Sequence, residues 1–190
     1  MASVELWWLP LGAGGQCVRV NGLVFEAGSA LLGRRTRCDL YHAGLTVSAP
    51  AGDYVIEVAP VWSGPAGSRG SVGEGPVGLR GLGRSRWFRY EVRCWRDGVI
   101  PDLEYAVASP VPLTREPDVA NRVLGQVARV PRPTWGRDEL GLGEMWNSNS
   151  VVSWTLATAG VDLGDVSPPA GGRAPGWDAG IGLALRSSRA

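Results

Sequence analysis

Residues 40–60 have the sequence LYHAGLTVSAPAGDYVIEVAP, two alternating runs around a Pro50-Ala51-Gly52 turn. Alternation with a period of two predicts β-strands over 40–48 and 53–60, joined as an antiparallel hairpin. Strand geometry then gives this hairpin one apolar face, made by Tyr41, Ala43, Leu45, Val47, Tyr54, Ile56 and Val58. The opposite face carries His42, Gly44, Thr46, Asp53, Val55 and Glu57.

His42 and Glu57 fall diagonally across this hairpin, within about 7–8 Å at the backbone. A carboxylate in that place can orient an imidazole ring and stabilise its cation. An ordinary half-exposed histidine–glutamate pair on a sheet face explains the same pattern without any catalytic role. The hairpin alone therefore leaves both interpretations open.

The segment MWNSNSVVSWTLATAG, residues 145–160, predicts a helix from Ser148 to Ala159 that ends at Gly160. Four residues suited to capping, 147–150, precede the apolar helix, whereas one cap needs only one of them. A helix N-terminus also favours negative charge and offers N–H groups to an oxyanion. Ser148 shares its helix face with the residues expected to pack on the sheet, and Ser150 is rotated about 200° away. Capping and catalysis by Ser148 are both consistent with this segment.

The order of these pieces resembles the circularly permuted papain-like fold, which includes permuted relatives of the NlpC-type peptidases and the lecithin:retinol acyltransferase family. The matching residues are His42 in LYHAGLTV, Glu57 in YVIEVAP and Asn147-Ser148 in WNSNSVVSW, within residues 38–160. The resemblance implies a nucleophile at Ser148, a base at His42 and an orienting group at Glu57. The family nucleophile is cysteine, so serine at this place is a departure. The whole chain also resembles small proteins of high-GC bacteria.

The remaining segments predict an α+β fold, an antiparallel sheet with the Ser148 helix packed on one face. We expect a single, loop-rich domain over residues 1–190, with a mobile loop over 63–85. The other predicted elements are strands over 4–10, 86–96, 105–108 and 180–185 and helices over 23–33 and 117–128. The helix over 117–128 has Val119, Val123 and Val127 on one stripe. Asp97-Gly98 predicts a hairpin turn, and Trp177 is expected to anchor a loop over 171–180.

Composition excludes several classes of site. The 190 residues carry a net charge of +1, and all 19 basic residues are arginine. Without lysine there is no Walker-type phosphate loop and no Schiff-base lysine. With one histidine, a multi-histidine metal site is excluded, and we expect neither a metal nor a cofactor. The sequence has no apolar run long enough to span a membrane, and its start lacks a positively charged n-region, so we expect a cytoplasmic protein.

Residues 80–96 carry six arginines among aromatic side chains. Arg80, Arg84 and Arg86 are candidates for binding an anionic group or a phosphate. This spacing can also bind single-stranded nucleic acid, but the low net charge disfavours it. The letters GEGPVG, residues 73–78, match a dinucleotide-binding pattern without the strand and helix that it needs.

Two functions follow from these observations. The first is a papain-like hydrolase or acyltransferase acting on an amide, ester or thioester through Ser148, His42 and Glu57. In this hypothesis Asn147 or Asn149 supports the helix start or the oxyanion, and the substrate is a small molecule or a peptide. The second is a catalytically inactive homologue that binds a protein partner.

Overall fold

The computed structural model describes residues 1–11, 38–61, 70–100 and 102–188. The described chain forms an α+β fold in which a six-stranded antiparallel sheet has the order β4-β5-β3-β2-β1-β6. The strands are β1 (Ser3–Pro10), β2 (Tyr41–Ala49), β3 (Gly52–Pro60), β4 (Ser71–Pro76), β5 (Arg89–Arg96) and β6 (Val111–Thr114). The helices are α2 (Pro117–Val127), α3 (Ser148–Thr158) and α4 (Trp177–Ser187). Short 3₁₀ turns are η2 (Arg80–Arg84), η3 (Arg86–Phe88) and η4 (Leu103–Tyr105).

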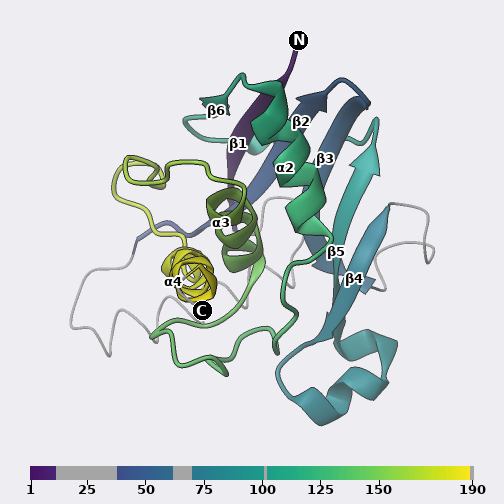
Figure 1. Ribbon diagram of the computed structural model, residues 1–190. Helices are drawn as coiled ribbons and strands as arrows, with labels where there is room; N and C mark the ends of the chain where they lie inside the picture. Colours follow the sequence, from purple (N-terminus) through teal and green to yellow (C-terminus); the bar gives the residue numbers. More distant parts are fainter. Residues whose placement is uncertain (12–37, 62–69, 101, 189–190) are drawn as a thin grey trace.

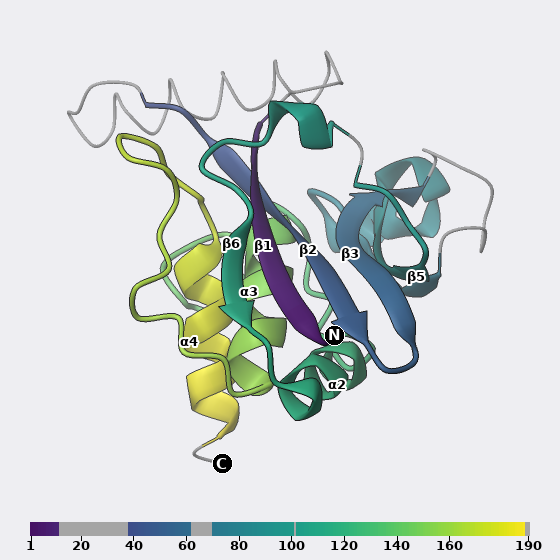
Figure 2. The ribbon, with the colours of Figure 1, turned by 90° about the horizontal axis from the view of Figure 1, so that it is seen from above.

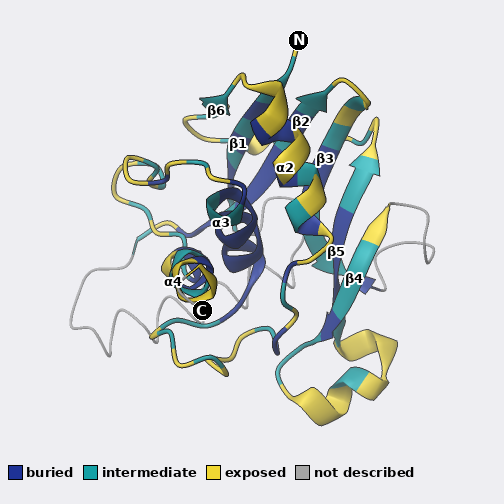
Figure 3. Ribbon diagram, viewed as in Figure 1, coloured by how far each residue is buried: buried dark blue, intermediate teal, exposed yellow. Residues whose placement is uncertain are grey.

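All three helices lie on one face of the sheet, with α3 between α2 and α4 (Figures 1 and 2). The predicted apolar face of the β2–β3 hairpin is the face that they cover. Its side chains join one core with those of the helices, including Val151, Val152 and Leu156 of α3. Residues 148–156 are all buried, and Figure 3 shows α3 as the most enclosed helix. The expectation of a nucleophile-type helix packed on one sheet face is confirmed in its structural part.

The opposite face of the sheet has a smaller core of Leu9, Val55 and Ile100. The chain between β5 and β6 packs there, through Ile100, Leu103 and Ala106. The predicted strand over 105–108 is therefore wrong. Both edges of β5 are already paired, with β3 and β4, so a hairpin return from Asp97-Gly98 has no free edge beside β5. The chain instead crosses the sheet and pairs as β6 with β1.

Two further expectations are corrected by the structure. The loop expected over 63–85 contains strand β4, which pairs with β5 at the sheet edge. The strand expected over 180–185 belongs to helix α4, whose buried residues Trp177, Gly180 and Ala184 recur at helical spacing. A side chain at Gly180 would collide with Ser153 and with the backbone of Ser150, so glycine permits α4 to lie close against α3.

Other local predictions hold. The strands β1, β2, β3 and β5 and the helix α2 form where the sequence predicts them, and no end differs by more than three residues. The stripe of Val119, Val123 and Val127 on α2 is buried. Trp177 is buried as expected, 6% exposed and packed against Trp8 with ring centroids 5.0 Å apart. It does not lie within a loop over 171–180, however, because it is the first residue of α4. The helix predicted over 23–33 lies outside the described residues.

Core packing around α3 predicts a clear difference between two leucines. Leu156 is fully buried on α3, whereas Leu185 on α4 is 53% exposed. Leu156→Ala removes buried apolar volume and is expected to lower the free energy of unfolding by about 2–5 kcal/mol. Leu185→Ala, the matched control, is expected to change it by less than about 0.5 kcal/mol. Urea denaturation measures both, and equal losses in the two variants would contradict the packing described.

Candidate functional site

Helix α3 begins with a complete capping arrangement. Asn147 is the N-cap, and its Oδ1 accepts hydrogen bonds from the N–H groups of Asn149 (2.9 Å) and Ser150 (3.4 Å). Ser150 Oγ accepts in return from the N–H of Asn147, at 3.1 Å. This reciprocal pair satisfies backbone donors that the first turn of a helix otherwise leaves without partners. The N–H groups of Asn149 and Ser150, which could have faced an oxyanion, therefore already have an acceptor.

The side chain of Asn149 connects this helix start to the sheet. Its Oδ1 accepts from the N–H of Ala43 at 2.8 Å, and its Nδ2 donates to the carbonyl of Tyr41 at 3.0 Å. The pairing of β2 with β3 ends at Leu45 and Ile56, so β3 does not cover this part of β2. Both groups are buried, and buried backbone groups need partners. The carboxamide of Asn149 takes the place of a neighbouring strand, beside the backbone of His42.

The same turn also holds the segment that leads into α4. The Nδ2 atoms of Asn147 and Asn149 donate to the carbonyl of Pro175, at 2.8 and 2.9 Å. Ser150 Oγ donates to the carbonyl of Gly176 at 2.7 Å. Gly176 has φ +84°, and a Cβ there would lie 2.6 Å from Asn147 Oδ1, so glycine is required. Three of the four polar residues at 147–150 thus join α3, β2 and the 175–177 segment.

Glu144 also contacts this junction, and the sequence analysis did not predict this contact. Its Oε2 accepts from the N–H of Gly176 at 2.8 Å. Burial raises the pKa of the Glu144 carboxyl, and the nearby Asp178 charge acts in the same direction. The Gly176 N–H opposes this rise, because it stabilises the carboxylate. In the sequence, Glu144 is recognisable only as an acidic residue that lies shortly before the helix start.

Ser148 is the member of this turn whose hydroxyl has no hydrogen bond within the described residues. It lies at the first position of α3 and is 6% exposed. Asn149, its neighbour in the chain, contacts the backbone on both sides of His42. The fold therefore brings the start of α3 next to the backbone of the His42 strand.

The His42 side chain leaves β2 on the face away from the helices. Its neighbours Tyr41 and Ala43 belong to the core beneath α3, and side chains alternate along a strand. Gly44, on the same side as His42, faces Leu9 and Ile100 of the smaller core. His42 is half-buried, and burial lowers the pKa of its imidazole to about 4. Within the described ranges no hydrogen bond joins His42 to Ser148 or to Glu57, so the expected hydrogen-bonded triad is not formed.

Glu57, which the sequence analysis expected to orient His42, is bound by an arginine of the neighbouring strand. Glu57 lies opposite Arg93 in the pairing of β3 with β5, and its Oε1 is 3.0 Å from Arg93 Nη1. Arg93 Nε also donates to Glu91 Oε1 at 2.7 Å. Arg93 is 1% exposed and Glu91 is 7% exposed. Charge-assisted hydrogen bonds of this kind are strong, and removing one partner from a buried set is costly.

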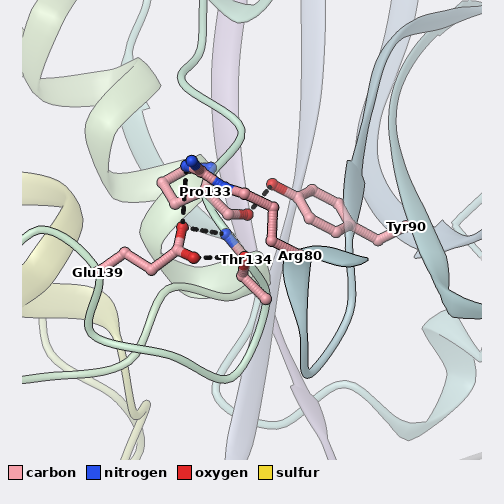
Figure 4. A network of polar contacts seen from close by, with 5 residues as sticks. All are labelled: Arg80, Tyr90, Pro133, Thr134 and Glu139. Atoms are coloured by element: carbon pink, nitrogen blue, oxygen red, sulfur yellow. Dashed lines mark hydrogen bonds and ion pairs between the residues drawn. The ribbon is translucent and has the colours of Figure 1, made fainter. Parts of the chain in front are cut away.

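The three arginines predicted to bind an anion lie in the turns η2 and η3, between β4 and β5. Arg80 is partly engaged, since its Nη2 is 3.6 Å from Glu139 Oε2. Figure 4 shows how Glu139 in turn accepts from the N–H and the hydroxyl of Thr134, beside the hydrogen bond from Tyr90 to Pro133. Arg84 and Arg86 have no ion pair with another described residue. Arg80 and Arg84, but not Arg86, line a common cavity.

Comparisons with known proteins gave no match: no protein-family model, no curated protein and no solved structure is matched by this chain. The resemblance to the permuted papain-like fold therefore stays a prediction that rests on the motifs around His42, Glu57 and Ser148.

Acid is expected to destabilise the fold through His42, the only histidine in the chain. Burial lowers the pKa of His42 to about 4, from about 6.5 in an unfolded chain. Between these values the unfolded chain binds more protons than the folded one. The contribution of neutral His42 is thus fully present above about pH 6.5 and is lost as the pH falls toward 4, by up to about 3 kcal/mol.

Urea unfolding at pH 7 and pH 5 measures this loss. His42→Gln removes the titrating group and is expected to reduce the pH dependence of the free energy of unfolding. The variant retains every carboxyl group, Glu144 included, so these groups serve as the internal control. Identical pH dependence in the two proteins would show that His42 titrates normally.

Proposed function

We propose that this chain is a catalytically inactive papain-like homologue that acts as a binding module. The observation that carries the proposal is the buried network of Glu57, Arg93 and Glu91. The carboxylate that would orient the base is bound instead to a guanidinium on the next strand. Among the residues that the structure describes, no carboxylate then pairs with His42 to stabilise its imidazolium.

The basicity of His42 supports the same proposal. A serine hydroxyl is a weak nucleophile and depends on an adjacent base to remove its proton. General bases work best when their pKa is close to the operating pH. Burial holds the pKa of His42 at about 4, so the ring has little affinity for the proton of Ser148 at neutral pH.

The helix start supports it as well. The carboxamide of Asn147 already binds the N–H groups of Asn149 and Ser150. An oxyanion would have to compete with this cap. Asn147 and Asn149, which the sequence analysis expected to support the helix start or the oxyanion, hold α3 in place, which is consistent with a retained fold and lost chemistry.

A second candidate is acyl transfer by Ser148 with His42 as base. Its support is the position of Asn149, which fixes the start of α3 beside the backbone of His42. The Ser148 hydroxyl, which makes no hydrogen bond to a described residue, would be the nucleophile, and the substrate would be a small molecule or a peptide.

Reaction with a serine-directed fluorophosphonate, followed by intact-mass spectrometry, separates the two candidates. The binding-module proposal predicts no covalent adduct on the native protein, because Ser148 lacks an effective base. An adduct that forms on the native protein and disappears in both Ser148→Ala and His42→Gln would overturn the proposal. Ser153→Ala, which removes a hydroxyl bound to the Trp177 carbonyl, is the control for loss of structure rather than loss of a nucleophile.

A further inference from the structure

Residues 79–89, which we call the arm, lie at the end of the sheet where β4 and β5 meet. The arm consists of the turns η2 and η3 and projects beyond the two strands (Figure 1). Figure 3 shows it as one of the most exposed parts of the molecule. Its base is fixed by the ion pairs of Arg80 with Glu139 and of Arg89 with Glu74.

The arm concentrates large apolar side chains at the surface. Four of the nine exposed large hydrophobic residues in the described part of the chain lie within its first ten residues: Leu79 (54% exposed), Leu82 (42%), Trp87 (68%) and Phe88 (44%). Single exposed apolar residues are ordinary, but clusters of them mark interaction sites.

The charge of the arm is entirely positive. Residues 75–90 include no acidic residue and four arginines, Arg80, Arg84, Arg86 and Arg89. Glu74 and Glu139 are within ion-pair distance of Arg89 and Arg80. Arg84 and Arg86 form no ion pair with any residue that the structure describes, so about two positive charges remain for a partner.

A cavity of about 290 Å³ lies beside the arm, where β4 meets η2. Arg80, Arg84 and Arg89 line it, together with Glu74 and the small residues Gly75, Pro76 and Gly83. Guanidinium groups bind phosphate oxygens through paired, charge-assisted hydrogen bonds. A phosphate group in this cavity would therefore have Arg84 as a contact.

We propose that the arm docks on an anionic phospholipid bilayer, with Trp87, Phe88, Leu79 and Leu82 in the interfacial layer and Arg84 and Arg86 at lipid phosphates. The proposal rests on the function as a binding module and names its partner. Segments that combine basic residues with Trp, Phe and Leu bind the surfaces of such membranes. Within the described residues no helix is long and apolar enough to cross a bilayer, so the contact would be peripheral.

A bilayer fits the arm better than an acidic protein or a nucleic acid. A stable protein interface buries about 800 Å² on each partner and is built from well-packed surfaces. The arm is a narrow projection with apolar side chains at its outside, which a fluid interface accommodates. Single-stranded nucleic acid needs a basic groove with stacking aromatic rings. The arm instead places Arg84 and Arg86, which form no ion pair with a described residue, on a projection.

Vesicle flotation of the full chain tests the proposal. We expect binding to vesicles of equal parts phosphatidylcholine and phosphatidylglycerol, weak binding to phosphatidylcholine alone, and a loss of binding as salt screens the arginines. Arg84→Gln with Arg86→Gln is expected to lower the partition coefficient about 30-fold, from the usual contribution of a basic residue near an anionic surface. Arg115→Gln with Arg129→Gln changes two exposed arginines elsewhere, and we expect it to leave binding unchanged.

The apolar contribution is tested separately. Trp87→Ser with Phe88→Ser is expected to reduce binding, whereas Leu185→Ser, at an exposed leucine of α4, is not.

Equal binding to neutral and anionic vesicles, no binding to either, or equal effects of the arm and control variants would overturn the proposal. So would displacement by soluble glycerol phosphate, or tighter binding of polyglutamate or single-stranded RNA. Failure here leaves the fluorophosphonate result untouched, because that experiment reports on Ser148 and not on the arm.

Discussion

The carboxamide of Asn149 is the contact on which the arrangement of this fold depends. It occupies the part of β2 that β3 leaves open, by accepting from Ala43 and donating to Tyr41. Leaving a buried backbone donor or acceptor without a partner costs about 1–3 kcal/mol for each group. The position of α3 on the sheet, and through Pro175 the start of α4, follow from satisfying these groups with one side chain.

This constraint explains why a polar helix start is buried. Asn147, Asn149 and Ser150 are each bound to backbone atoms of other segments, and Ser153 on the next turn of α3 donates to the carbonyl of Trp177. Where such an array is complete, it fixes the geometry of the elements that it joins. The polar residues of the opposite sheet face form a second, separate array around Arg93. The asparagines at the start of α3 and Glu57 thus belong to two separate structural networks.

The predictions that succeeded rest on local periodicity. Alternation fixed the two faces of the β2–β3 hairpin, and the valine stripe fixed α2, because both patterns lie within one element. The failures concern partners that are distant in the sequence. Glu57 was assigned to the correct face of its strand, but the register that places it opposite Arg93 is set by the sheet.

Two misassigned elements have related causes. The apolar run in 180–185 alternates well enough for a strand, and only packing against α3 through Gly180 selects the helix. Strand β4 contains two glycines and a proline, and it forms because the edge of β5 is available to it. The capping role of Asn147 was predictable from the sequence, whereas the second role of Asn149 required the open edge of β2.

Amide hydrogen exchange at Ala43 tests the central claim, that Asn149 joins α3 to β2, most directly. In the native protein this N–H donates to Asn149 Oδ1 and is expected to exchange only through global unfolding. In Asn149→Ala its protection is expected to fall well below that of core amides such as Leu45, while Asn121→Ala, an exposed change on α2, leaves it unchanged. Rapid exchange of Ala43 in the native protein, or unchanged protection in Asn149→Ala, would contradict the account.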